Sequence, residues 1–173
     1  MTPEVKKILY ATDLTKNSAY ASYFAGDLAG KYGAKVVILH CVGLIDPSVL
    51  YDGPVSDPSK SLKKAAEKET EEHVAELKKR MQDYFKKEEM GSGQPRSDLV
   101  SETIVTSGYA VDKILDTADA KGCDLIVLGT HGKGWLKTTF LGSVARAVLE
   151  RTRKPVFIVP LPPEETSIDW GLH

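Results

Sequence analysis

Cysteine is scarce in this chain. The 173 residues include two cysteines, Cys41 and Cys123, which stand far apart at the ends of apolar runs. Such a pair suits neither a disulfide framework nor a cysteine-rich metal site. Because cysteine is among the residue types most often buried in proteins, we expect two buried, reduced thiols.

Long apolar segments are missing from the sequence. A membrane-spanning helix needs roughly 18 or more consecutive apolar residues, and no such run occurs. Residues Met1 to Lys7 have neither the apolar core of a signal peptide nor an arginine-rich presequence. We therefore expect a cytoplasmic protein that has no membrane partner.

The chain also has little excess charge of either sign. Its 23 basic and 24 acidic residues give a formal net charge of -1, so no general basic field attracts nucleic acid. An anion must then be held by a local site. No two of the four histidines stand at the spacing of metal ligands, and we predict no metal site built by the protein alone.

The first forty residues predict a strand, a helix and a second strand. Val5 to Ala11 and Lys35 to Val42 are short apolar runs with little alternation, which is typical of strands buried on both faces of a parallel sheet. Asn17 to Tyr32 is predicted as a helix, which Gly33 ends. Its apolar stripe is formed by residues four apart, namely Tyr20, Phe24, Leu28 and Tyr32.

The second half of the chain repeats this alternation. We predict strands at Leu99 to Thr106, Asp124 to Gly129 and Pro155 to Pro160. Helices are predicted at Tyr109 to Ala120, with Ile114, Leu115 and Ala118 facing inward, and from Ser143 to about Arg151. The fold class that follows is α/β, with a doubly wound, five-stranded parallel sheet of Rossmann-like type and strand order 3-2-1-4-5.

Residues 44–97 are longer than a plain crossover requires. Three X-Pro pairs mark an irregular loop, and Ser59 to Glu89 is then predicted as one long amphipathic helix. Its inward stripe is Leu62, Ala66, His73, Leu77, Met81 and Tyr84. We therefore predict one domain over residues 1–160 with an insertion at about 44–97, and a C-terminal tail at 161–173.

A glycine pattern after the fourth predicted strand indicates a phosphate-binding turn. Gly129 is followed by Gly132, nine further residues, and then Gly142 and Ser143. Glycines let backbone N–H groups come close to a phosphate, and the start of a helix adds unpaired N–H groups and a positive dipole end. The Ser143 hydroxyl can cap the helix or bond a phosphate oxygen.

This pattern, GTHG followed after nine residues by GS, resembles the nucleotide-binding motif of the universal stress protein family. The resemblance extends to ILYATDLTKNS, KVVILHCV and KPVFIVP, and so covers most of the chain outside residues 44–97 and the tail. In the ATP-binding branch of that family, the glycines and the serine hold the phosphates and ribose. The end of the first strand contacts the nucleoside.

The resemblance implies that this chain binds ATP, with Mg²⁺ or Mn²⁺ held mostly by phosphates and water. Asp13 would bond ribose or adenine, and Cys41 and Val42 would lie against the base. Loop residues from Lys133 to Leu141 either reach the outer phosphates or are solvated, and His131 lies beside the ligand without acting as a base. The predicted binding residues are Ala11, Thr12, Asp13, Cys41, Val42, Gly129, Thr130, His131, Gly132, Lys133, Gly142, Ser143 and Val144.

Three other functions are weighed against a nucleotide-dependent stress-response sensor. An ATP-using enzyme would show a GxxxxGK[ST] string or another fixed phosphate loop; the chain has none, so we expect no enzyme, or at most slow ATP hydrolysis. A receiver-like domain would need an acidic cluster at the third strand, which ends in Thr106-Ser107-Gly108. The third function is a stress-response interaction protein with an empty pocket, and the intact glycine motif argues against it.

The last predicted strand bears on assembly. Val156 to Val159 is apolar and would form an exposed sheet edge. In the universal stress protein family the last strands of two subunits pair, so the resemblance implies a homodimer through about residues 155–160. Coverage of this edge by the C-terminal tail is the alternative. The downstream protein partner and the physiological nucleotide are not identified by the sequence.

Overall fold

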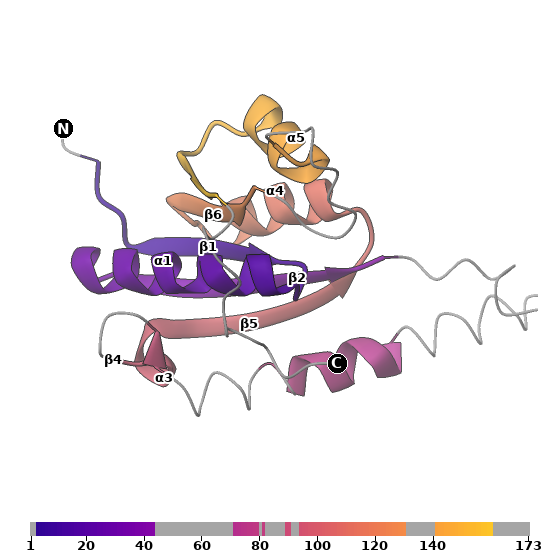
Figure 1. The fold of residues 1–173 in the computed structure, drawn as a ribbon, viewed down its shortest axis with the longest axis horizontal. Coiled ribbons are helices and arrows are strands. Elements are labelled where there is room, and N and C mark those ends of the chain that lie inside the picture. The colour runs from indigo at the N-terminus through magenta and orange to yellow at the C-terminus, as the bar shows by residue number, and fades with distance from the viewer. Residues whose placement is uncertain are drawn as a thin grey trace, which may run out of the picture.

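A five-stranded parallel sheet forms the centre of the protein in a computed structural model, which describes residues 3–43, 71–79, 81, 89–90, 94–130 and 141–160. The strand order is β5-β2-β1-β6-β7, and β1, β2 and β5 run side by side in one direction in Figure 1. Numbered by their succession along the chain, these strands have the predicted order 3-2-1-4-5. Their bounds are Lys7–Thr12 for β1, Lys35–Val42 for β2, Val100–Ser107 for β5, Leu125–Gly129 for β6 and Val156–Val159 for β7.

Helices cover both faces of the sheet, as a doubly wound fold requires. Helix α1 (Lys16–Tyr32) lies on one face, and α4 (Ala110–Ala120) and α5 (Ser143–Arg151) lie on the other (Figure 1). Two apolar clusters result, one on each side of β1. Ile8 and Tyr10 point into the α1 layer, whereas Leu9 points into the α4 and α5 layer, and all three are fully buried.

Helix α1 packs on the sheet through small residues. Ala21, Ala25 and Ala29 are completely buried. The partly buried side chains of Tyr20, Phe24 and Leu28 pack against the same cluster. The prediction that Tyr32 belongs to the buried stripe is wrong, because its side chain is 58% exposed. Residues spaced by four drift around a helix of 3.6 residues per turn, so the last member of the stripe leaves the sheet.

Part of the long insertion packs against the α1 face. Residues 71–79 and 81 are helical, and Leu77, Met81 and the partly buried Val74 join the α1 cluster. The prediction that His73 lies in the inward stripe is wrong, since His73 is exposed. The other predicted stripe residues, Leu62, Ala66 and Tyr84, lie outside the described residues.

The return from the insertion contains short elements that we did not predict. Strands β3 (Glu89–Met90) and β4 (Gln94–Pro95) form a small antiparallel pair, and the one-turn helix α3 (Arg96–Leu99) leads into β5. Strand β5 therefore begins at Val100 and ends at Ser107, one residue later at each end than predicted. The described helices contain none with the length and apolar character needed to cross a bilayer.

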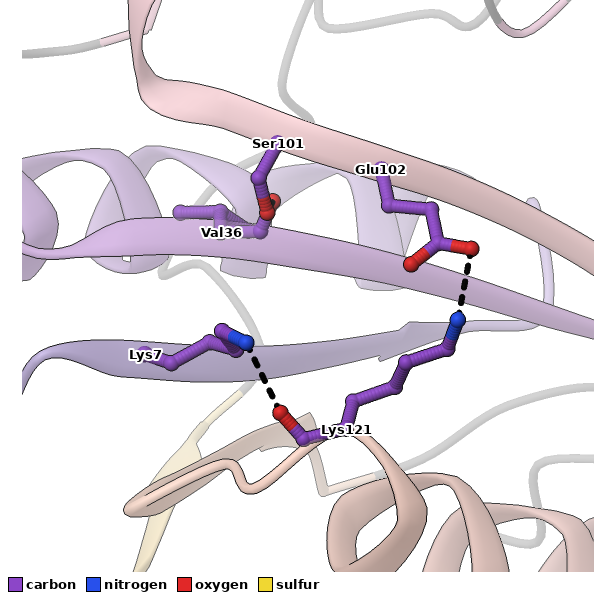
Figure 2. Close-up of polar contacts among 5 residues, drawn as sticks. All are labelled: Lys7, Val36, Ser101, Glu102 and Lys121. Atoms are coloured by element: carbon purple, nitrogen blue, oxygen red, sulfur yellow. Dashed lines mark hydrogen bonds and ion pairs between the residues drawn. The ribbon is translucent and has the colours of Figure 1, made fainter.

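Polar contacts tie the loops together at the amino ends of the strands (Figure 2). The Lys7 ammonium donates to the Lys121 carbonyl oxygen at 2.8 Å, and the Lys121 ammonium reaches Glu102 Oε1 at 2.8 Å. Nearby, Asp124 Oδ2 accepts the backbone N–H groups of Lys6 and Lys7, both at 2.9 Å. These bonds fix where β1 enters the sheet beside β6.

Asp124→Ala is expected to lower the free energy of unfolding by about 1 to 2 kcal/mol, because it leaves two backbone N–H groups without their acceptor. Urea unfolding followed by circular dichroism measures the change. Asp116→Ala, an exposed aspartate on α4, is the control and should change stability by no more than about 0.5 kcal/mol. Equal stability of the two variants would contradict the role given to Asp124.

Candidate functional site

The carboxyl end of β1 is held in a specific shape by local hydrogen bonds. Asp13 Oδ1 accepts from Thr15 N at 3.0 Å and from Thr15 Oγ1 at 2.7 Å. Thr15 in turn caps α1 by accepting from Ser18 N, as side chains at helix starts commonly do. Leu14, between them, has a positive φ of 64°, a conformation that a residue with a branched side chain adopts only under constraint. Asp13 is thereby oriented beyond the sheet edge.

A buried polar network supports this turn from below. Thr12 Oγ1 and Ser18 Oγ are 2.8 Å apart, and the Tyr10 hydroxyl donates to the Ser18 carbonyl oxygen. His40 Nδ1 lies 2.8 Å from the Thr12 carbonyl oxygen, so this ring has a backbone partner, as expected for a histidine at a strand end. The network joins β1, β2 and α1, because Thr12, His40 and Ser18 belong to these three elements.

The ends of β2 and β5 form the next part of the same edge. The Gly108 N–H donates to the Val42 carbonyl oxygen at 3.0 Å, and Cys41 Sγ lies 3.2 Å from the Gly108 carbonyl oxygen. Cys41 and Val42 are both partly exposed. Burial raises the pKa of the Cys41 thiol, and the nearby Lys113 ammonium opposes that rise in part. Cys41 and Cys123 are both free thiols, and Cys123 is 1% exposed.

The predicted phosphate cradle brings together the end of β6 and the start of α5. Gly129 is the last residue of β6, and Gly142 immediately precedes α5. The Gly142 N–H donates to the Thr130 carbonyl oxygen at 2.6 Å, and the Thr130 N–H donates to the Val159 carbonyl oxygen at 2.9 Å. Thr130 and Gly142, which precede and follow residues 131–141, therefore lie together at one point of the sheet edge.

The first turn of α5 is open to a ligand. Gly142 gives it no side-chain cap, and Ser143 and Val144 are exposed. The first N–H groups of a helix have no partner within the helix, so they are available to an anion. Gly142 has φ -65° and ψ 157°, which any residue can adopt. Close approach of a ligand, and not backbone conformation, is therefore a reason for glycine at this position.

These groups meet where the winding direction of the sheet changes. Strand β1 pairs with β2 on one side and β6 on the other. The chain leaves β1 through α1 on one face and leaves β6 through α5 on the other. A crevice at such a point, outside the carboxyl ends of the strands, is where open α/β sheets bind ligands. Asp13 thus shares one edge with Cys41, Val42 and the predicted phosphate cradle.

Ten of the thirteen predicted binding residues can be placed at this edge. His131, Gly132 and Lys133 lie outside the described residues, as do loop positions 134–140. Within the part of the chain that the structure describes, no three His, Cys, Asp or Glu side chains gather where they could hold a metal ion.

The comparison with known families identifies the family of the chain. The sequence profile of the universal stress protein family matches residues 4–160. This chain belongs to the universal stress protein family. Universal stress protein MJ0577 of Methanocaldococcus jannaschii is 30% identical over 164 residues, which is 92% of this chain and 97% of that protein. Universal stress protein A of Escherichia coli K12 is 29% identical over 160 residues, covering 92% and 97%.

Solved structures of universal stress proteins share the fold. The structure of MJ0577 matches with a TM-score of 0.68 and 23% identity, over 92% of this chain and 99% of that one. A universal stress protein in complex with cAMP matches with a TM-score of 0.53 and 20% identity, over 90% and 97%. At these identities the likeness supports the α/β architecture and the strand order.

Sequence reasoning missed several residues that shape the edge. Thr15 and Ser18 hold the β1 turn, and Gly108 and Lys113 border Cys41. The run Thr12-Asp13-Leu14-Thr15 did carry a signal, because Asp and Thr separated by one residue often form a local turn before a helix. Gly108 likewise follows an apolar strand at its carboxyl end.

Proposed function

We propose that this universal stress protein binds ATP, or a closely related adenine nucleotide, at the carboxyl edge of the sheet. The observation that carries the proposal is the joined pair of elements at the cradle, where the uncapped start of α5 is hydrogen-bonded back to the end of β6 through Gly142 and Thr130. Backbone N–H groups at such a helix start suit phosphate oxygens. The preoriented Asp13 carboxylate, which can only accept hydrogen bonds when ionised, suits a ribose hydroxyl or the adenine amino group.

The metal in this proposal arrives with the nucleotide. Mg²⁺ keeps several water ligands and is commonly bound through substrate phosphates, so Mg²⁺ or Mn²⁺ would be carried by the ATP phosphates. The universal stress protein solved with cAMP supports an adenine nucleotide as the ligand class.

Titration calorimetry of dialysed protein with ATP and Mg²⁺ tests the binding. Acid extraction and chromatography should come first, so that any copurified nucleotide is detected. Micromolar binding, or a trapped adenine nucleotide, is the expected result. An empty pocket that binds no nucleotide would reject the proposal and favour an interaction protein of the same fold.

Occupancy of the site would then act as a switch. The loop between Thr130 and Leu141 starts and ends beside the cradle, so a bound nucleotide can change the surface that a partner protein contacts. Hydrogen exchange should slow in this loop when ATP binds. Unchanged exchange in the loop and the adjoining surface, under conditions where ATP is bound, would reject the switch. The proposal includes a cytoplasmic location, which cell fractionation tests. It also includes no catalytic turnover of ATP, so phosphate release from ATP should be slow or absent.

Cys41 gives a chemical test of where the base lies. Because burial raises its thiol pKa, we expect Cys41 to react with iodoacetamide at pH 7.5 more slowly than a free cysteine, since the thiolate is the nucleophile. If the base covers the sulfur, ATP should slow the reaction further, by about threefold or more, because the reagent cannot reach the thiolate. Peptide mass spectrometry follows Cys41 separately from the buried Cys123. Equal rates with and without saturating ATP would remove Cys41 from the base-side wall.

We also propose that two copies pair through β7. This strand is at the edge of the sheet, and Phe157 on it is 37% exposed while its ring packs near Phe24, with centroids 6.0 Å apart. Phe157→Glu should convert a dimer to a monomer in sedimentation velocity at micromolar concentration, because a carboxylate would be buried in the pairing. Tyr32→Glu, at an exposed site on α1, should leave the dimer intact. A monomeric wild-type protein would reject the pairing.

A further inference from the structure

Lys113 is placed over the carboxyl end of β5, next to the proposed base-side residues. It belongs to the first part of α4, which follows Gly108 and Tyr109. Its side chain folds back toward the strand, so that Lys113 Cε lies 2.9 Å, and Cγ 3.7 Å, from where a Cβ on Gly108 would stand. The aliphatic stem of the lysine thus occupies the space that the glycine leaves open.

Gly108 itself is firmly fixed beside β2. Its N–H bonds the Val42 carbonyl oxygen at 3.0 Å, and its carbonyl oxygen lies 3.2 Å from Cys41 Sγ. Its φ of 136° is a region that residues with a side chain rarely adopt. The position of Lys113 above this glycine is therefore tied to the ends of β2 and β5.

The Lys113 ammonium has no carboxylate within salt-bridge distance among the described residues, whereas two other charged residues of α4 are paired. Asp112 bonds Arg151 at 2.8 Å, and Asp119 bonds Lys154 at 3.2 Å. Lys113 does act electrostatically on Cys41, where it lowers the thiol pKa against the larger effect of burial. Its positive charge therefore acts at the binding edge and is not neutralised there by a described acid.

We propose that Lys113 is a base-side binding residue, whose ammonium donates a hydrogen bond to an acceptor nitrogen of the adenine ring. The inference rests on the proposed nucleotide site and adds a residue outside the glycine motif. Adenine has ring nitrogens that accept hydrogen bonds, and lysine can donate to them. Gly108 serves this role by giving the lysine stem room to lie over the strand end.

Lys113→Met tests the role, since methionine keeps an unbranched stem over Gly108 and removes the charge. ATP and adenosine are titrated into the variant and the wild-type protein by calorimetry, with thermal unfolding as a check of folding. Loss of one hydrogen bond from a charged donor predicts roughly tenfold weaker binding, by a similar factor for both ligands. Lys31→Met removes the same charge on α1, where Lys31 pairs with Asp27, and should change affinity by less than about twofold.

The outcomes separate the two proposals. If the wild-type protein binds neither ligand, the nucleotide site fails and the inference fails with it. If the wild-type protein binds and Lys113→Met binds equally well, only the role of Lys113 is overturned. Weaker binding of ATP with unchanged binding of adenosine would also overturn it, because the lysine would then contact the phosphates. Recovery of both affinities in Lys113→Arg supports a donor at this position.

Discussion

Gly142→Val should weaken ATP binding by more than about tenfold, or about 1.4 kcal/mol, while the protein remains folded. Gly142 has a backbone conformation open to any residue, with φ -65° and ψ 157°, so valine introduces no backbone strain there. Its branched side chain would instead occupy the space beside the first N–H groups of α5, where we place the phosphates. Gly132 lies outside the described residues, and from its place in the glycine motif we expect Gly132→Val also to weaken ATP binding by more than about tenfold.

Calorimetry with ATP and Mg²⁺ measures this loss, and circular dichroism confirms that the fold persists. Gly30→Val provides a matched control, because Gly30 is exposed near the end of α1, on the side of the sheet where the amino ends of the strands lie. It should bind ATP with wild-type affinity. Wild-type affinity in Gly142→Val would mean that the phosphates lie elsewhere.

Leu9→Ala should have the largest effect on stability. Leu9 is fully buried in the central strand β1, where it packs in the α4 and α5 layer. Removing a buried leucine side chain costs about 2 to 5 kcal/mol, through lost burial and the cavity left behind. Ile8→Ala removes a comparable side chain from the opposite layer and should cost a similar amount.

Urea unfolding of each variant at one temperature gives these free energies. Tyr32→Ala is the control, because Tyr32 is 58% exposed, and it should change stability by no more than about 0.5 kcal/mol. A loss near zero for Ile8→Ala beside a large loss for Leu9→Ala would contradict the picture of two equally packed layers on the sheet. If both variants are folded, saturating ATP should raise their midpoints as it does for the wild-type protein.

The principal strands could be predicted because strands buried on both faces consist of consecutive apolar residues. Strands β1 and β2 have buried residues at successive positions, so each appears in the sequence as an unbroken apolar run. Gly33 could be predicted as the end of α1 for a related reason. It has φ 63° and its N–H returns to the Ala29 carbonyl oxygen, a helix end that favours glycine.

Other parts of the fold were beyond the reach of sequence patterns. A two-residue strand such as β3 or β4 is too short to show a period, and its pairing depends on contacts with α1 and α3. In the insertion helix, Val74 faces the core instead of His73. Spacing alone did not separate these adjacent positions, because the apolar stripe of a helix is broad.

The candidate site likewise has features that could be predicted from the sequence and features that could not. The places of Gly129 at a strand end and of Gly142 and Ser143 at a helix start could be predicted, because a glycine-rich turn between a strand and a helix has a recognisable spacing. The hydrogen bonds of Asp13 to Thr15, and of His40 to the Thr12 carbonyl oxygen, could not be predicted as a set. The Asp13 bonds are local, but the His40 bond joins two strands, and the separation of His40 from Thr12 in space depends on the register of β1 against β2.

The hydrogen bond from Gly142 to the Thr130 carbonyl oxygen has a consequence for how such a site can diversify. The bond holds the two residues together at the sheet edge, so the fold fixes the two points between which the intervening segment must run. Doubling the length of a flexible closed segment costs only about 0.6 kcal/mol in closure entropy. Outside the motif residues His131, Gly132 and Lys133, insertions and substitutions in this segment can therefore accumulate with little loss of fold, which gives descendants of one scaffold different recognition surfaces around the same ligand.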